Sequence, residues 1–317
     1  MSSNYPNGIE NLVIRNMPLT MLYPGKIFWV DGSSITPVDG AVGGQDGGPG
    51  TFNRPFATID YAIGKCTANR GDIIMVKPGY TESLSIASAI TVDVAGIAIV
   101  GCGLGSLRPQ LTFTATDATI VVSAANCSFI NMQFVAGIAD VVTGLSLTAA
   151  ADGFSMEECW STEGAVAGTY NFIDVITLAT GANDLSWKNC TFIGNDTNND
   201  SFITGVAHDG FYVDNCRFYS NVAQAAAVGL IDSSGNVTNA EIKNSSFRSN
   251  IDGALWVDFN GAANSGIIKN CVVSSIDTAG AQNTLDFTGG HAFQCYMSGE
   301  ADAWGLEGGG TAVYNNA

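Results

Sequence analysis

The sequence predicts an all-β chain, folded as a right-handed parallel β-helix with three strands per coil and about nine coils. Three observations support this prediction. A short motif recurs along most of the chain, apolar residues occupy every second position before its copies, and Gly is abundant (38 residues) whereas charged residues are sparse (13%). Many short strands separated by tight turns are typical of such a composition.

The repeated motif is Asn-Cys-x-Phe. Complete copies begin at Asn126, Asn189 and Asn215, and variants begin at Asn244 and Asn270. When looser copies are included, the second position of the motif falls at residues 102, 127, 159, 190, 216, 245, 271 and 295, so successive copies lie 24 to 32 residues apart. A period of this length indicates a solenoid in which each repeat forms one coil.

The residues before each copy predict a strand with one face turned inward. Leu185 and Trp187 precede Cys190 by five and three positions, and Phe211 and Val213 precede Cys216 in the same way. Apolar residues at a spacing of two place their side chains on one face of a strand.

The motif itself predicts a structural ladder at a corner of the coil. Asn tolerates the left-handed backbone of a tight bend, and stacked Asn amides can bond to one another from coil to coil. The Cys that follows turns inward as a small apolar side chain, and the Phe fills the core. We expect these ladder residues: Asn126, Cys127, Asn189, Cys190, Asn215, Cys216, Asn244, Asn270 and Cys271. A second ladder could form at Asn195, Asn221 and Asn250.

The eight cysteines are expected to be free thiols. Equivalent residues of stacked coils have parallel side-chain vectors, which suit a disulfide poorly. The sequence contains no Cys-x-x-Cys pair of the kind that binds zinc.

The ends of a solenoid need covers, because they expose unpaired strand edges. Residues 54–69 predict a capping α-helix with Pro55 near its first turn and with Phe56, Ile59 and Ile63 on one face. We therefore divide the chain into an N-terminal arm (1–26), a strand, loop and capping helix (27–71), the β-helix body (72–303) and a C-terminal cap or tail (304–317).

Residues 27–82 resemble the opening of pectate-lyase-like β-helix proteins. The resemblance rests on Ile27-Phe28-Trp29-Val30-Asp31, Pro55-Phe56-Ala57-Thr58-Ile59, Gly71-Asp72-Ile73-Ile74 and Val76-Lys77-Pro78-Gly79-Tyr80. It implies a superfamily that includes polysaccharide lyases, glycoside hydrolases, phage tailspikes and non-enzymatic virion proteins, so fold alone does not choose a function. With residues 58–63 in a chain that is nearly all scaffold, the sequence most resembles β-helix structural (decoration) proteins of tailed-phage virions.

The charge of the chain argues against two classes of partner. Acidic residues outnumber basic ones 29 to 12, for a formal charge of −17. Such a surface repels the phosphates of nucleic acid and anionic lipid, so neither partner is expected. No signal peptide or membrane-spanning stretch is apparent, which predicts synthesis in a host cytoplasm.

No catalytic residue, cofactor or metal site is predicted with specificity. His208 and His291 lie several coils apart and are expected at the surface. A glycosidase needs two carboxylates, one with a raised pKa. Candidate acids are Glu157, Glu158 and Glu163, or Asp174 with Asp184. A possible Ca²⁺ loop at residues 196–207 has Ser201 in place of Gly and Ala207 in place of the bidentate Glu, whereas the Asp/Gly loop at residues 39–50 could ligate Ca²⁺.

The function predicted from the sequence is a non-enzymatic virion structural protein, a capsid decoration protein of a tailed phage. The alternative is a short tailspike-like protein that binds or cleaves a host surface polysaccharide. The expected partners are two further copies of the chain in a homotrimer and the major capsid protein or another virion protein. The partner-binding segment is expected at Met17, Leu19, Met21, Leu22 and Tyr23. Alternatively, this segment only covers the first coil.

Overall fold

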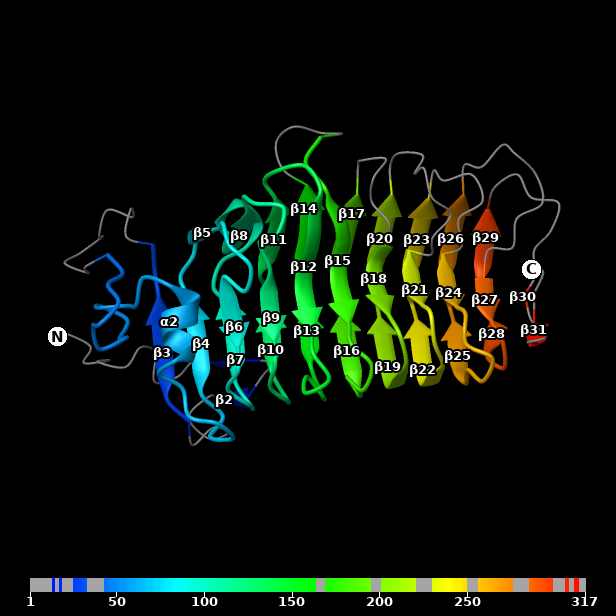
Figure 1. The fold of residues 1–317 in the computed structure, drawn as a ribbon, viewed down its shortest axis with the longest axis horizontal. Helices are drawn as coiled ribbons and strands as arrows, with labels where there is room; N and C mark the ends of the chain where they lie inside the picture. Colours follow the sequence, from blue (N-terminus) through cyan, green and yellow to red (C-terminus); the bar gives the residue numbers. More distant parts are fainter. Residues whose placement is uncertain are drawn as a thin grey trace.

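The computed structural model describes residues 13–14, 17–18, 25–32, 43–163, 169–194, 201–220, 230–249, 256–275, 285–298, 306–307 and 311–313. In this part of the chain nearly all regular structure is β-strand, and all strands except one short antiparallel pair near the N-terminus form three parallel sheets that run the length of an elongated body (Figure 1). The chain passes from one sheet to the next and returns to the first one coil further along. The fold is therefore a parallel β-helix, as the sequence predicts.

Sheet 1 contains eleven strands in the order of their stacking. They are β3 (Ile27–Val30), β4 (Ile73–Val76), β7 (Ala98–Gly101), β10 (Ser128–Ile130), β13 (Ser155–Glu157), β16 (Leu185–Lys188), β19 (His208–Asp214), β22 (Val237–Lys243), β25 (Gly266–Lys269), β28 (His291–Phe293) and β31 (Thr311–Val313).

Sheets 2 and 3 contain nine strands each. Sheet 2 consists of β5 (Thr81–Leu84), β8 (Gln110–Phe113), β11 (Gln133–Ala136), β14 (Trp160–Glu163), β17 (Thr191–Gly194), β20 (Arg217–Ser220), β23 (Ser246–Ser249), β26 (Val272–Ser275) and β29 (Tyr296–Ser298). Sheet 3 consists of β6 (Ile90–Val92), β9 (Ile120–Val122), β12 (Val141–Leu147), β15 (Phe172–Leu178), β18 (Ser201–Gly205), β21 (Ile231–Ser233), β24 (Val257–Phe259), β27 (Leu285–Phe287) and β30 (Leu306–Glu307).

Each coil contributes one strand to each sheet, which confirms the prediction of three strands per coil. The number of coils differs slightly from the expected nine, because β3 and β31 extend sheet 1 beyond the other two sheets at either end. The described part of residues 304–317 also continues the coils, since β30 pairs with β27 and β31 pairs with β28.

The corner between sheets 1 and 2 is built on residues with left-handed backbone. The residue before the inward-turning position of this corner has a φ of 52° to 56° in seven successive coils. In the first six of these coils its backbone N–H donates to a carbonyl of the next coil, as from Asn189 to Asp214 (3.0 Å) and from Asn215 to Lys243 (3.1 Å). The seven residues are Asn131, Glu158, Asn189, Asn215, Asn244, Asn270 and Gln294.

Asn126 and Cys127 lie at a different corner from the one that the sequence assigns to them. They precede β10 of sheet 1, so they form the corner between sheets 3 and 1, where Gly153 and Asp184 also have positive φ. In this coil Asn131 and the buried Met132 occupy the corner before sheet 2. Both corners require one residue with left-handed backbone followed by one with an inward side chain. The Asn-Cys pair of the motif can therefore fit either corner.

The interior of the coil is filled by stacked side chains. Phe192, Phe218 and Phe247 occupy equivalent positions in β17, β20 and β23. Neighbouring rings are 4.9 Å apart at their centroids and inclined by only 3° and 6°. All three side chains are buried, so the Phe of the motif fills the core as expected.

The capping helix is shorter than the sequence predicts. Helix α2 covers only Ile59–Ile63, with Thr58 as its N-cap and with Ile59, Ala62 and Ile63 buried. The preceding Phe56 is extended instead, because its amide donates to the Trp29 carbonyl (2.8 Å) and it bridges to Val30 in parallel. The helix closes the first coils beside β3, β4 and β6 (Figure 1).

Candidate functional site

Sheet 3 has a row of carboxylates on its outward face. Asp232 of β21 and Asp258 of β24 are partners in the parallel register, and both are flanked by buried residues that point inward. Adjacent strands lie about 4.8 Å apart, so the two side chains leave the sheet side by side. The same register position is continued by Asp286 in β27 and Glu307 in β30. On the other side of β21 it is occupied by Thr204.

The environment of Asp232 makes it unusual among the acids of the chain. Partial burial raises its pKa to about 6, and the neighbouring charges of Asp258 and Asp174 add to this effect. Two carboxylates on neighbouring strands cannot both ionise without strong repulsion, so one of them retains its proton to higher pH. Asp232 is therefore the member of the row that holds a proton up to about pH 6.

Asp174 of β15 also acts on Asp232. In the strand register it pairs with Ser201, three positions before the Thr177–Thr204 pair that continues the row. The Thr204 hydroxyl of β18 donates to Asp174 Oδ1 at 2.7 Å, and the charge of Asp174 contributes to the raised pKa of Asp232. Three carboxylates from β15, β21 and β24 thus influence one another.

The arrangement is suited to acid–base chemistry. A carboxyl group whose pKa lies near 6 can give up a proton at slightly acidic or neutral pH, and a neighbour that stays ionised can act as base, nucleophile or electrostatic stabiliser. Carboxylates with pKa values that diverge because of their environments commonly divide these roles. The outward face of β21 and β24 is therefore our candidate active surface.

The repulsion in this row predicts that Asp232→Asn stabilises the protein. The folded state raises the pKa of Asp232 above its ordinary value of 3.8, so the ionised side chain destabilises the fold above about pH 6, and this effect disappears as the pH falls. We expect a gain of about 1 kcal/mol at pH 7.5, discounted for the partial exposure of the group. Urea denaturation at pH 7.5 and pH 4 would measure it. A variant no more stable than wild type at pH 7.5 would contradict the assigned repulsion.

The sequence contains a repeated signal for this row, which the motif Asn-Cys-x-Phe does not reveal. The triplets Ile231-Asp232-Ser233, Val257-Asp258-Phe259 and Leu285-Asp286-Phe287 repeat an Asp between two buried residues at intervals of 26 and 28 residues. The Asp residues cannot be aligned from spacing alone, because the loops between corners vary in length. The register of the strands decides that Asp232 and Asp258 are partners.

The acids proposed from the sequence do not form a comparable pair. Glu157 lies on β13, Glu158 at the corner that follows, and Glu163 at the end of β14. Asp184 lies at the corner before β16, whereas Asp174 lies on β15 of sheet 3. Of these candidates, Asp174 is the one whose charge acts on Asp232.

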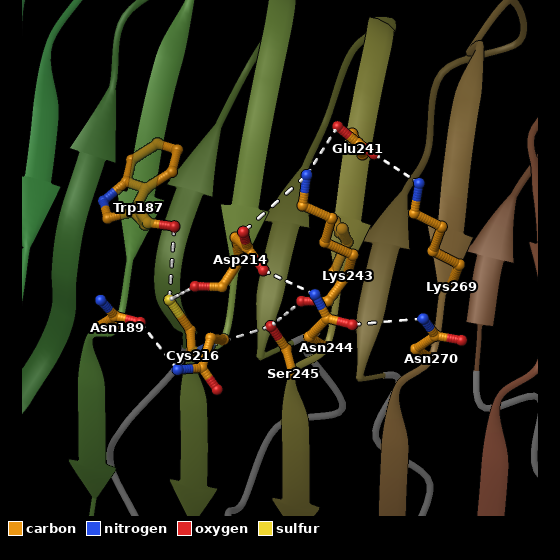
Figure 2. Close-up of polar contacts among 12 residues, drawn as sticks. Trp187, Asn189, Asp214, Cys216, Glu241, Lys243, Asn244, Ser245, Lys269 and Asn270 are labelled. Atoms are coloured by element: carbon orange, nitrogen blue, oxygen red, sulfur yellow. Dashed lines mark hydrogen bonds and ion pairs between the residues drawn. The ribbon is translucent and has the colours of Figure 1, made fainter.

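The expected ladder residues form a polar network at the corner between sheets 1 and 2 (Figure 2). The Asn215 Nδ2 donates to Asn189 Oδ1 at 2.8 Å, and Asn270 Nδ2 donates to Asn244 Oδ1 at 3.3 Å. Between these pairs Asn244 donates to Asp214 instead (2.9 Å), so the amide ladder is interrupted there. The contacts join neighbouring coils and have no evident chemical reactivity.

The thiol positions next to this network are closed to solvent. Cys190, Cys216 and Cys271 are buried, and their sulfur atoms lie 3.4 to 3.9 Å from backbone carbonyl oxygens. Burial raises the pKa of Cys190, which keeps it a thiol. All eight cysteines are free in the structure.

His208 is not a surface residue, contrary to the expectation from the sequence. Its side chain is buried, with Nδ1 3.0 Å from the Ala182 carbonyl and Nε2 accepting from the Val206 amide at 3.2 Å. Burial lowers its pKa and thus favours the neutral ring. Both ring nitrogens are occupied by backbone contacts, so the ring has a structural role.

The other expected sites are only partly within the described residues. Met17 lies in β2 (Met17–Pro18), which pairs in antiparallel fashion with β1 (Val13–Ile14) and belongs to none of the three sheets. Leu19, Met21, Leu22 and Tyr23 lie outside the described residues, as do Asn195, Asn221 and Asn250.

The described residues contain no group of three or more His, Cys, Asp or Glu side chains placed to hold a metal ion. Among the same residues, no helix has the length and apolar character needed to span a membrane.

Comparison with known proteins gives structural likeness without sequence likeness. No family model and no curated protein matches the chain. Among solved structures it is similar to a rhamnogalacturonan lyase, with a TM-score of 0.50 and 12% identity over 85% of this chain and 81% of the other. The chain shares the parallel β-helix fold of that enzyme. This agrees with the resemblance of residues 27–82 to pectate-lyase-like proteins.

Two structures of pectin methylesterase in complex with hexasaccharides are more distant. They have TM-scores of 0.43 and 0.39 at 12% and 13% identity, and cover 83% and 84% of this chain and 90% and 81% of theirs. At these identities the comparison identifies the fold only.

Proposed function

We propose that this protein cleaves a polysaccharide and that the outward carboxylates of β21 and β24 carry out the reaction. The observation that supports the proposal is the stacked pair of Asp232 and Asp258, in which Asp232 has a pKa of about 6. Paired carboxylates with different protonation states are the requirement of glycoside hydrolysis. The parallel β-helix shared with a rhamnogalacturonan lyase is consistent with a long polymeric substrate.

In the proposed reaction Asp232 is the general acid. Its proton passes to the bridging oxygen as the bond between that oxygen and the anomeric carbon breaks, and the carboxylate of Asp258 attacks the same carbon to form a glycosyl ester. Water, deprotonated by the ionised Asp232, then releases the sugar from Asp258. We assign Asp258 as nucleophile because neighbouring strands are about 4.8 Å apart, close to the separation of roughly 5 Å found in retaining enzymes.

The test uses the full chain with polygalacturonate, rhamnogalacturonan and a neutral glucan, followed by measurement of reducing ends. Asp232→Asn and Asp258→Asn should each lower the rate by about 10²-fold or more, because each removes a group required by the reaction. Asp93→Asn is the control, since this exposed acid follows β6 outside the row. The wild-type rate should fall as the pH rises above about 6, where Asp232 loses its proton.

Three results would contradict parts of the proposal. Unsaturated ends in place of reducing sugars would indicate an eliminating enzyme. Products with inverted anomeric configuration would require carboxylates farther apart than those of neighbouring strands, and would overturn the role of Asp258. Full activity of the Asp232→Asn variant would remove the acidic row from the mechanism.

The virion role predicted from the sequence remains a separate proposal. It is supported by the resemblance of the first coils, and none of the contacts described above bears on it. It includes a homotrimer, a capsid partner and an anchor at residues 17–23. If it is correct, deleting residues 1–23 should leave a folded rod that no longer binds particles. A truncated protein that still binds them would exclude this anchor.

A further inference from the structure

Sheet 2 presents an outward face whose charge is opposite to that of the whole molecule. Between β5 and β26, its two outward-facing rows contain Arg217 and Arg248 and no Asp or Glu. Both Arg side chains are exposed. In a chain with a formal charge of −17, this face can approach an anionic partner with less repulsion than the acidic row of sheet 3.

An exposed aromatic side chain lies in the same face. Trp160, the first residue of β14, is 41% exposed, although Trp side chains are usually covered. The guanidinium of Arg108 stacks on its ring, with 4.4 Å between Arg108 Cζ and the ring centroid. A ring with one face covered by a cation and much of its surface open to solvent is a platform for a flat partner.

Arg108 is held in place by the corner between sheets 1 and 2. Its Nε donates to Asn131 Oδ1 at 2.8 Å, and Asn131 is itself buried and donates to the carbonyls of Gly101 (2.8 Å) and Gly103 (2.7 Å). Within the described residues, these contacts leave the two terminal amino groups of Arg108 without an acceptor. They form a fixed fork of the kind that binds a carboxylate in bidentate fashion.

The positions beside Trp160 in the sheet are polar and neutral, and the nearby acid is the exposed Glu158 at the preceding corner, whose charge acts on Arg108. Its register partners are Gln133 in β11 and Thr191 in β17, and Gln133 Nε2 donates to Thr162 Oγ1 at 3.0 Å. Arg217 follows in the same row two strands beyond β14, at about 10 Å. The strand spacing of about 4.8 Å is similar to the length of one sugar unit, so successive units of a chain laid along the axis would meet successive strands.

We infer that the outward face of sheet 2 around Arg108, Trp160 and Arg217 binds an acidic polysaccharide, with Trp160 packed against a sugar ring and the two Arg side chains on uronate carboxylates. This site lies on a different sheet from the acidic row and does not depend on the proposed cleavage. An anionic peptide shares the charge but lacks a ring that could stack on Trp160.

Binding of polygalacturonate to the full chain, measured by titration calorimetry at low salt, tests the inference. Trp160→Ala, Arg108→Gln and Arg217→Gln should each weaken binding at least tenfold. Tyr212→Ala is the matched control, because Tyr212 is an aromatic side chain of similar exposure (38%) on sheet 1. Asp93→Asn, an exposed acid after β6 and outside the acidic row, should bind as the wild type does. Release of reducing ends is measured separately, so a failure of the cleavage proposal would leave the binding result unchanged.

A neutral galactan and poly-glutamate complete the experiment. Weaker binding of both than of polygalacturonate supports recognition of the acidic sugar. Equal binding of poly-glutamate would assign the face to polyanions in general and overturn the inference. Failure of the wild type to bind polygalacturonate, or unchanged binding by Trp160→Ala with a wild-type circular dichroism spectrum, would also overturn it.

Discussion

Replacing Cys190 by Asp should destabilise the protein by about 4 kcal/mol or more, because it places an ionisable group with no partner inside a closed coil. Cys190 is buried, its sulfur contacts the carbonyls of Met156 and Lys188, and burial raises its pKa. Neighbouring coils allow little relaxation, since each pairs with the next along all three sheets. The midpoint of urea denaturation, followed by circular dichroism, would measure the effect.

Two controls separate the buried charge from other effects. Cys190→Ser should cost only about 1 kcal/mol, because Ser245 already occupies the equivalent corner one coil beyond Cys216 and donates to the Lys243 carbonyl at 2.8 Å. Lys188→Asp on the exposed face should change stability by about 1 kcal/mol or less. If Cys190→Asp is as stable as Cys190→Ser, the interior at this corner is more open than the structure indicates.

Replacing Asp72 by Ala should destabilise the N-terminal end by about 3 kcal/mol. The carboxylate is fully buried and accepts four hydrogen bonds, from the Lys26 and Thr67 amides at 2.7 Å and from Arg70 Nε and Nη2 at 2.7 Å and 2.5 Å. Its loss leaves these donors unpaired where water has little access. This value is at the lower end of the range for breaking a buried ion pair, because the Arg70 side chain is 29% exposed.

The same contacts predict a pH dependence. Burial by itself raises the pKa of Asp72, but the hydrogen bonds from Arg70, Lys26 and Thr67 outweigh it, and the net pKa lies below the ordinary value of 3.8. The stabilisation is therefore present above about pH 4 and is lost as the pH falls through the folded-state pKa. Urea denaturation of wild type and Asp72→Ala at pH 7 and pH 3 should show the difference shrinking at low pH. Asp117 is an exposed acid, and the free energy of unfolding of Asp117→Asn should remain within about 0.5 kcal/mol of the wild-type value at both pH values.

The sequence by itself determined the repeat and the environment of each repeated position. Corners such as Asn189-Cys190 and Asn215-Cys216 require a left-handed residue followed by an inward side chain, and two apolar residues before them require a strand with one buried face. These requirements are local, so they are visible in any single coil. Free thiols, the three strands of each coil and the stacked Phe side chains follow from the same local rules.

Only the tertiary structure decided which residues of different coils lie next to one another. Loops of different length separate the corners, so Asn126 could be assigned to either of two similar bends, and the strand register was needed to place it between sheets 3 and 1. The same register pairs Asp232 with Asp258, residues 26 positions apart, and sets Trp160 two strands from Arg217. A raised pKa and a stacked guanidinium depend on distances of a few ångströms between coils, and these arise from the stacking of the coils rather than from the sequence of any one of them.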